Sequence, residues 1–236
     1  MKKILFAFVL FGHLGFGQSS IDSTKTGKLI PYIAPAILMT GGLVVQGAVS
    51  KNLRDNLWLK QFPNFENHAD DALAFSPLIL SIGLGASGVK GKHDFGDQIL
   101  LAGLSNVVSS GISITLKNMI KYERPDASNN YSFPSGHTTF AFTGAAILSE
   151  EYGQKSIAYS IGGYALATTT ASMRMMNNKH WLADVMFGAG IGVASTKLVY
   201  AIYPLIQQKI FKTKKIAVVP TFSGNGTAGV YAAFKL

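Results

Sequence analysis

Residues 127–149 read ASNNYSFPSGHTTFAFTGAAILS and carry no charged side chain apart from the titratable His137. A turn-prone half, rich in Ser and Asn, is followed by an apolar half that begins near Phe140. We expect the apolar half to form a helix, with Ser135 as its N-cap and Gly136 allowing the backbone to approach a ligand. Free amides at a helix N-terminus favour an anion, and His137 is placed to donate a proton to a leaving oxygen. Taken alone, the motif also fits an ordinary capped helix with a surface histidine.

Five further stretches are almost as poor in charge, with Lys197 as their single charged residue. These stretches are 29–50, 72–89, 98–116, 156–173 and 185–208. None shows the strict alternation of a strand, so we predict an all-α protein built as a six-helix bundle. Several stretches reach the length of a membrane span, yet their many Gly, Ser and Thr residues also suit the core of a compact bundle. We favour a membrane-embedded or membrane-associated domain over 29–208.

The composition restricts the kind of protein. Of 236 residues, 48% are hydrophobic and 14% are charged, which excludes a disordered chain. The absence of cysteine excludes disulfides, cysteine-ligated metals and thiol nucleophiles. A net charge of +9 suits an anionic partner, but no aromatic platform accompanies the basic residues, so we expect no nucleic-acid binding.

The two ends of the chain differ from the rest. Residues 1–17 combine Lys2 and Lys3 with an apolar run and then small residues, which is typical of a secretory signal peptide, and a polar lead-in follows over 18–28. An uncleaved anchor is the alternative. Residues 209–236 hold a basic segment and then two β-prone runs around the turn sequence 223–226, which predicts a β-hairpin tail.

The first basic motif is KNMIKYERP, residues 117–125. Its spacing would place Lys117, Lys121 and Arg124 on one helical face, and Pro125 disfavours continuation of the helix. Two or three cations would then converge at one helix end. Taken alone, this pattern also fits a basic helix end that complements the helix dipole.

The third motif is RMMNNKHWLAD, residues 174–184. His180 and Asp184 are four apart, so a carboxylate would lie one turn from the imidazole and orient it. Arg174 adds a guanidinium whose fork matches phosphate oxygens. A surface His–Asp pair is the alternative interpretation.

Two other runs contain His and Asp, residues 68–71 and 93–97. Neither has the ligand set or spacing of a known metal site, so we expect both to be polar loops. No metal ligands are predicted.

The order and spacing of the three motifs resemble the superfamily of type 2 phosphatidic acid phosphatases and vanadium haloperoxidases. Its pattern is Lys, six residues, Arg-Pro; then Pro-Ser-Gly-His; then Ser-Arg, five residues, His, three residues, Asp. The charged and imidazole positions all match here. Met173 departs from the pattern, because it stands where the family has Ser, with Ser172 one place earlier.

This resemblance implies a helical phosphatase that needs no metal or other cofactor. The implied catalytic residues are His180 as nucleophile, His137 as general acid and Asp184 as the partner of His180. The implied phosphate-binding residues are Lys117, Arg124, Ser135, Gly136 and Arg174.

The resemblance leaves the substrate open. We expect a lipid phosphate or diphosphate, with the membrane as partner and the site facing the periplasm of the cell envelope. The alternatives are a soluble periplasmic acid phosphatase of broad specificity and a non-catalytic helical envelope protein. The sequence does not indicate an oligomeric state.

Overall fold

The computed structural model describes residues 29–63, 65–211, 215–222 and 228–235, with side chains as far as Gln207. The expected signal peptide, the polar lead-in and the turn 223–226 lie outside the described residues. The chain divides into two compact units, one ending at Lys197 and the other beginning at Leu198. Each unit is described by itself.

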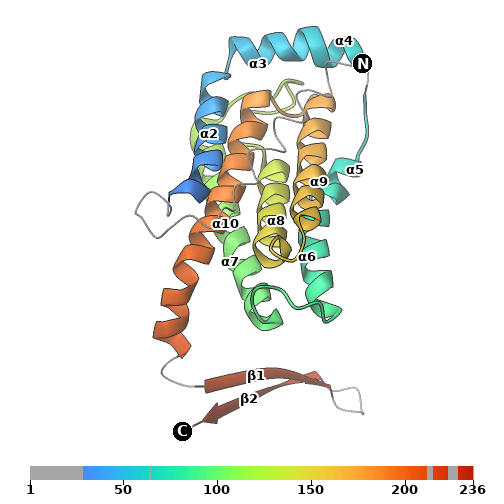
Figure 1. Cartoon of the computed structure of the whole chain (residues 1–236). Helices are drawn as coiled ribbons and strands as arrows, with labels where there is room; N and C mark the ends of the chain where they lie inside the picture. Colours follow the sequence, from blue (N-terminus) through green and yellow to red (C-terminus); the bar gives the residue numbers. More distant parts are fainter. Residues whose placement is uncertain (1–28, 64, 212–214, 223–227, 236) are drawn as a thin grey trace. The chain divides into compact units, whose positions relative to one another are not determined.

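The first unit is a bundle of helices (Figure 1). The helices are α2 (Ile30–Val44), α3 (Ala48–Leu53), the π-helix η1 (Arg54–Trp58), α4 (Leu59–Gln61), α5 (Ala69–Leu73), α6 (Ser76–Ala86), α7 (Phe95–Ile120), α8 (Gly136–Tyr152), α9 (Ile157–Met176) and α10 (Leu182–Phe211), which continues into the second unit. Each charge-poor stretch contains one principal helix. Short helices occur as well within the described residues, so the expected count of six is too low.

Helix α8 forms the centre of the bundle, with α6, α7, α9 and α10 around it (Figure 1). It is buried over nearly its whole length, and Ala141, Ala145 and Ile147 have no exposed surface. Its small side chains let neighbouring helices approach closely, and a Cβ on Gly192 of α10 would lie only 2.6 Å from the carbonyl oxygen of Thr139. Close packing on all sides fixes the first turn of α8, which carries the Ser-Gly-His sequence.

A run of short helices, α3, η1 and α4, crosses one end of the bundle (Figure 1). It meets α2 at an angle of 84°. The bend follows Gly47, whose φ of +78° is a conformation that favours glycine. The buried Ser50 hydroxyl accepts a hydrogen bond from the backbone N–H of Ala183, at 3.2 Å. The run therefore contacts the first turn of α10.

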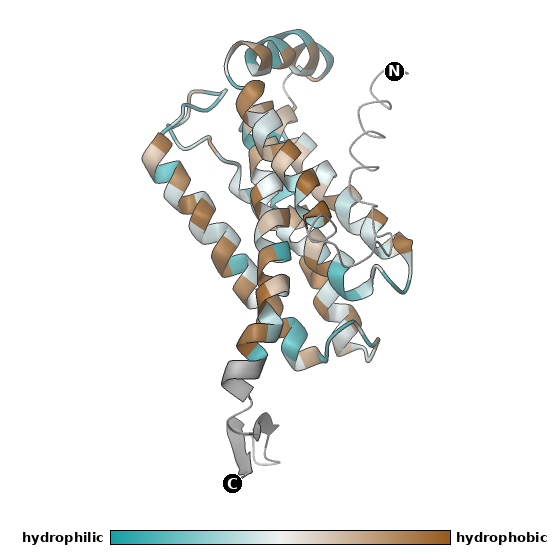
Figure 2. Ribbon diagram, turned by 60° about the vertical axis from the view of Figure 1, so that its left-hand side comes forward, coloured by the Kyte–Doolittle hydropathy of each residue, from teal (hydrophilic) through white to brown (hydrophobic). Residues whose placement is uncertain are grey.

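Two helices of the described chain are long and apolar enough to cross a membrane, α7 and the part of α10 from Leu182 to Gln207. Helix α2 and the run that follows would be a third if the bent pair is one span. More than half of the surface of Val107, Ile114 and Met119 on α7 is exposed. Figure 2 shows hydrophobic residues recurring along the long helices. Such apolar surface is unfavourable in water, which indicates a membrane location.

The second unit contains the end of α10 and two strands. Strand β1 (Lys215–Phe222) pairs antiparallel with β2 (Ala228–Lys235). Lys215 lies opposite Lys235, and Phe222 lies opposite Ala228. The side chains of the expected basic segment lie outside the described part of the chain.

Candidate active site

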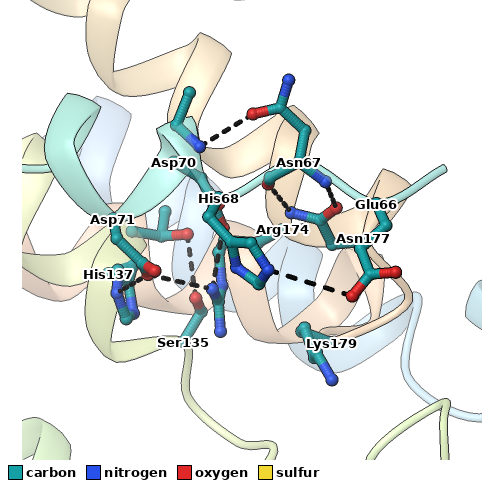
Figure 3. Close-up of polar contacts among 12 residues, drawn as sticks. Glu66, Asn67, His68, Asp70, Asp71, Ser135, His137, Arg174, Asn177 and Lys179 are labelled. Atoms are coloured by element: carbon teal, nitrogen blue, oxygen red, sulfur yellow. Dashed lines mark hydrogen bonds and ion pairs between the residues drawn. The ribbon is translucent and has the colours of Figure 1, made fainter.

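The three motifs meet at one end of the bundle. The first follows the C-terminus of α7, the second forms the start of α8, and the third joins α9 to α10. Figure 3 shows part of this region, where α5 also approaches the second and third motifs.

His180 and Asp184 form a buried pair in the site. Nδ1 of His180 lies 3.5 Å from Oδ2 of Asp184, and both side chains are almost fully buried. His180 stands before α10 rather than on it, because the helix begins at Leu182. Burial lowers the pKa of His180 to about 4 and outweighs the raising effect of Asp184, while Arg174 and Lys117 lower the pKa further. The imidazole is therefore neutral at pH 7.

Asp184 is held in place by several hydrogen bonds. Its Oδ2 accepts a hydrogen bond of 2.5 Å from the Ser132 hydroxyl and one of 2.8 Å from the backbone N–H of Trp181. Its backbone carbonyl accepts one from the N–H of Ser135, at 3.1 Å. Sequence analysis did not single out Ser132, because a serine in a polar loop has no distinguishing local pattern.

Lys117 reaches from the last turn of α7 toward the second motif. Its Nζ donates to the carbonyl oxygens of Tyr131, at 2.6 Å, and Pro134, at 2.9 Å. An ammonium group has three donors. One N–H of Lys117 therefore remains for a ligand.

The first motif does not continue as a helix, so the expected common helical face is wrong. Helix α7 ends at Ile120, and Lys121 adopts a left-handed conformation with φ of +49°. This turn carries the chain away from the helix axis. The exposed Lys121 is not part of the same face as Arg124.

Arg124 comes from the loop after α7. Its backbone N–H donates to the carbonyl of Asn129, at 3.0 Å. Burial and the nearby charge of Arg174 lower the pKa of Arg124, although it stays a cation. Its Nε is buried and has no hydrogen-bond acceptor among the described residues.

Arg174 is buried and pairs with a short helix outside the three motifs (Figure 3). Its Nη1 lies 2.7 Å from Oδ2 of Asp70 and 3.6 Å from Oδ1 of Asp71, both on α5. Its Nε, like that of Arg124, has no acceptor within the described chain. A buried guanidinium needs a counter-charge, and Asp70 provides it. The expectation that residues 68–71 form only a polar loop is therefore wrong.

His137 also contacts α5. Its Nε2 lies 2.8 Å from Oδ1 of Asp71 (Figure 3). Burial and the charge of Arg174 lower the pKa of His137 below its usual value, and the carboxylates of Asp71 and Asp70 partly oppose this effect. Sequence analysis predicted the imidazole but not its acidic partner.

Ser135 is the N-cap residue of α8, but its side chain does not cap the helix. Its Oγ accepts a hydrogen bond of 3.0 Å from the hydroxyl of Thr138. Its backbone N–H donates a hydrogen bond to the backbone carbonyl of Asp184. The amides of Gly136 and His137 have no acceptor within the helix and are therefore open to an anion.

Arg54 connects the first and third motifs from the crossing run of helices. Its Nε donates to Oδ1 of Asn178, at 2.7 Å, and its Nη2 donates to the carbonyl of Pro125, at 2.9 Å. The guanidinium also lies over the Trp181 ring, 5.5 Å from its centroid. No local pattern in the sequence could have indicated these contacts, because Arg54 is more than 70 residues from each partner.

The run 93–97 lies at the start of α7, far along that helix from Lys117. Nδ1 of His93 lies 2.8 Å from Oε1 of the buried Glu151, so this run is more than the expected polar loop. Asp94 is the N-cap residue of α7. In the part of the chain that the structure describes, no three His, Cys, Asp or Glu side chains gather as metal ligands would.

The sequence profile described as the PAP2 superfamily matches residues 98–208, which include all three motifs. The lipid A 1-phosphatase of Porphyromonas gingivalis is 32% identical over 168 residues, which are 70% of this chain and 38% of that protein. The match to the PAP2 superfamily therefore covers the region that contains the site. The chain thus spans well under half the length of this relative.

Two solved structures are similar. A transmembrane PAP2 type phosphatidylglycerolphosphate phosphatase from Bacillus subtilis has a TM-score of 0.53 at 19% identity, covering 73% of this chain and 97% of that chain. LpxE from Aquifex aeolicus has a TM-score of 0.47 at 20% identity, covering 63% of this chain and 95% of that chain. The similarity to the Bacillus protein supports a shared fold.

Proposed function

We propose that the protein is a phosphatase that hydrolyses a lipid phosphate or diphosphate through a phosphohistidine on His180. The observation that carries the proposal is the combination of a buried, neutral imidazole with two guanidinium groups whose Nε atoms lack an acceptor among the described residues. Buried donors without partners are costly. The oxygens of a phosphoryl group, bound beside His180, would satisfy Arg124 and Arg174.

The geometry of His180 supports Nε2 as the attacking nitrogen. Nδ1 faces Asp184, so Nε2 is the nitrogen that remains for phosphorus. As the nitrogen–phosphorus bond forms, the bond from phosphorus to the leaving oxygen breaks. Asp184 stabilises the positive charge that develops on the imidazole, and its hydrogen bonds with Ser132 and Trp181 keep it in place.

The non-bridging oxygens need positive charge in the transition state. Lys117, Arg124 and Arg174 supply it, together with the amides of Gly136 and His137 and the hydroxyl of Ser135. The Ser135 hydroxyl accepts from Thr138, which leaves its own proton for a phosphate oxygen. In this proposal the cations take the role that metal ions have in many phosphoryl-transfer enzymes, and no cofactor takes part.

His137 handles the proton. It gives a proton to the leaving oxygen in the first step, and then takes one from the water that attacks the phosphohistidine. The second step breaks the nitrogen–phosphorus bond. It releases inorganic phosphate and returns both histidines to their starting state.

The surroundings of the site support the proposal of a lipid substrate. Apolar helices long enough to span a membrane carry Lys117 and Asp184. The relative from Porphyromonas gingivalis is a lipid A 1-phosphatase, so a phosphate on an envelope lipid is the substrate we propose. Contacts with the lipid tail would then supply binding energy at the reacting phosphorus. We also propose that the site faces the periplasm, in line with the signal-like sequence at residues 1–17.

Trapping of the covalent intermediate tests the mechanism. Enzyme purified in detergent is mixed with a radiolabelled lipid phosphate and quenched in base, where phosphohistidine survives, or in acid, where it does not. The wild type should retain label after the basic quench, and His180→Ala should retain none. His68→Ala is the matched control, because this imidazole is highly exposed. Label retained by His180→Ala would reject the assignment.

Turnover of a lipid phosphate, p-nitrophenyl phosphate and glycerol phosphate separates the functional alternatives. A lipid phosphatase should have the highest kcat/KM on the lipid, whereas an acid phosphatase of broad specificity should treat all three alike. No turnover of any of them would indicate a non-catalytic protein. Vanadate should inhibit competitively, and EDTA should have no effect. Loss of activity with EDTA that Mg²⁺ restores would contradict the metal-free mechanism.

A cysteine label tests the orientation. Asn130 is exposed in the loop between the first two motifs, and the chain contains no cysteine of its own. Asn130→Cys should react with a membrane-impermeant maleimide once the outer membrane is opened. Reaction only after the inner membrane is broken would place the site in the cytoplasm.

A further inference from the structure

We propose that Asp71 is a positioning residue for the general acid: its carboxylate holds Nε2 of His137 and so presents Nδ1 to the leaving oxygen. The inference rests on the proposed function and adds a residue that lies outside the three motifs. It also lies outside the matched region 98–208.

The contact itself is short and specific. Oδ1 of Asp71 lies 2.8 Å from Nε2 of His137 and 3.6 Å from Nη1 of Arg174 (Figure 3). A neutral imidazole has one N–H donor, and a protonated one has two. When Nε2 donates to Asp71, the second proton of the imidazolium is on Nδ1. That is the proton available for the substrate.

The two histidines of the site have matching arrangements. Nδ1 of His180 faces Asp184 and leaves Nε2 for phosphorus, whereas Nε2 of His137 faces Asp71 and leaves Nδ1. In an in-line displacement the leaving oxygen lies opposite the nucleophile. Each imidazole thus has its own carboxylate, and the two carboxylates come from different helices. Asp184 serves the nucleophile His180, and Asp71 serves His137 on the side of the leaving oxygen.

The charges around His137 point to Asp71 rather than to its neighbour. Asp70, Asp71 and Arg174 are the charged groups that act on the imidazole, with α5 supplying the two carboxylates and α9 the guanidinium. Asp70 is buried and paired with Arg174 at 2.7 Å, so its charge is largely balanced. Asp71 is the carboxylate in direct contact, and it favours the protonated imidazole that a general acid requires.

Asp71 is also replaceable without loss of buried structure. Its side chain is 56% exposed, whereas that of Asp70 is 1% exposed. Asp71→Asn keeps the size of the side chain and removes only the charge. Asp71→Glu keeps the charge and shifts the carboxylate by one methylene.

The first test measures the pKa of the His137 imidazole directly and does not depend on activity. Histidine-labelled protein in detergent is titrated by NMR, and His137→Gln assigns the resonance. Asp71→Asn should lower the pKa of His137 by about 0.5 to 1 relative to wild type, and Asp71→Glu should lower it less. Asp94→Asn is the matched control, because this exposed residue is the N-cap of α7, about 35 Å along the helix from Lys117. An unchanged titration in Asp71→Asn would overturn the proposal.

The second test uses the leaving group. A general acid matters most when the leaving alcohol is a poor one, so Asp71→Asn should reduce kcat about 10-fold or more on an alkyl or lipid phosphate. On p-nitrophenyl phosphate, which has a good leaving group, the loss should be under about 3-fold. Equal losses on both substrates would show a purely structural role and overturn the proposal. An inactive wild type would instead reject the proposed function, and the NMR titration would still decide the role of Asp71.

Discussion

Ser132 donates a hydrogen bond of 2.5 Å to Oδ2 of Asp184, the same oxygen that lies 3.5 Å from Nδ1 of His180. Both side chains are fully buried, and they come from segments 52 residues apart. The hydroxyl therefore fixes the carboxylate that orients the proposed nucleophile. This relationship makes Ser132 part of the site although it belongs to no motif.

Replacement of this serine should affect turnover more than binding. In Ser132→Ala, Asp184 keeps only the backbone hydrogen bond from Trp181 at Oδ2. We expect kcat to fall about 10-fold, because the carboxylate orients His180 less well, with little change in KM. Steady-state kinetics on a lipid phosphate provide the measurement. Ser128→Ala is a control in an exposed part of the preceding loop. A change in KM alone would contradict the assigned role.

The pH dependence should follow the two histidines. His180 attacks when neutral, and burial lowers its pKa to about 4, so kcat/KM should fall only as the pH drops toward 4. His137 donates when protonated, and burial and the charge of Arg174 hold its pKa below the usual value, so kcat/KM should also fall as the pH rises, at a lower pH than for a free imidazole. The optimum should therefore be acidic.

The pH–rate profile of kcat/KM checks this expectation. The profile is measured with several substrates whose phosphate groups differ in pKa. A limb that shifts from one substrate to the next belongs to the substrate, and a limb that stays in place belongs to the enzyme. An acidic limb that stays near pH 6.5 with every substrate would show that His180 is not held neutral by burial.

Close packing of α10 on α8 should be sensitive to one methyl group. A Cβ on Gly192 would lie 2.6 Å from the carbonyl oxygen of Thr139 and 2.8 Å from the backbone nitrogen of Thr143. Gly192→Ala should lower the free energy of unfolding by about 1–3 kcal/mol and reduce activity, since α8 carries His137. Gly111→Ala on α7 is the control, because its added Cβ would meet no atom of the other described residues within 4 Å beyond the local helix backbone. It should be neutral or stabilising by about 0.5–1 kcal/mol. Unfolding in detergent measures both.

Arg54 should contribute through its hydrogen-bond geometry and not only through its charge. Arg54→Lys keeps the charge but loses either the contact with Asn178 or the one with Pro125. We expect the free energy of unfolding to fall by about 1–2 kcal/mol, with a several-fold loss of kcat/KM, because the first and third motifs are held less firmly. Lys51→Ala, an exposed change on the same run of helices, should have neither effect. Thermal unfolding and kinetics in detergent test the pair, and equal effects would contradict the role of Arg54.

Local sequence predicted the regular parts of the protein well. Charge-poor stretches located the principal helices, because a helix buried in apolar surroundings excludes charge along its length. Prediction from the local sequence failed at the ends of helices, where the conformation of a single residue determines whether the helix continues. Lys121 takes a left-handed conformation, so Arg124 leaves the expected face. Ser135 donates its amide to the distant Asp184 carbonyl, and its hydroxyl accepts from the Thr138 hydroxyl instead of capping α8.

The three motifs, with the spacing of His180 and Asp184, the cations and the Ser-Gly-His turn, could be found from the order of residues alone, because each motif is a short local pattern. The groups that contact these side chains became known only from the packing of the helices. Asp70 and Asp71 lie more than 60 residues before the imidazole and guanidinium that they contact. Ser132 lies 52 residues before Asp184, and Arg54 lies 124 residues before Asn178. Such contacts depend on how helices pack. A periodic pattern specifies which face of a helix is apolar, but it does not specify which distant side chain will meet a buried charge there.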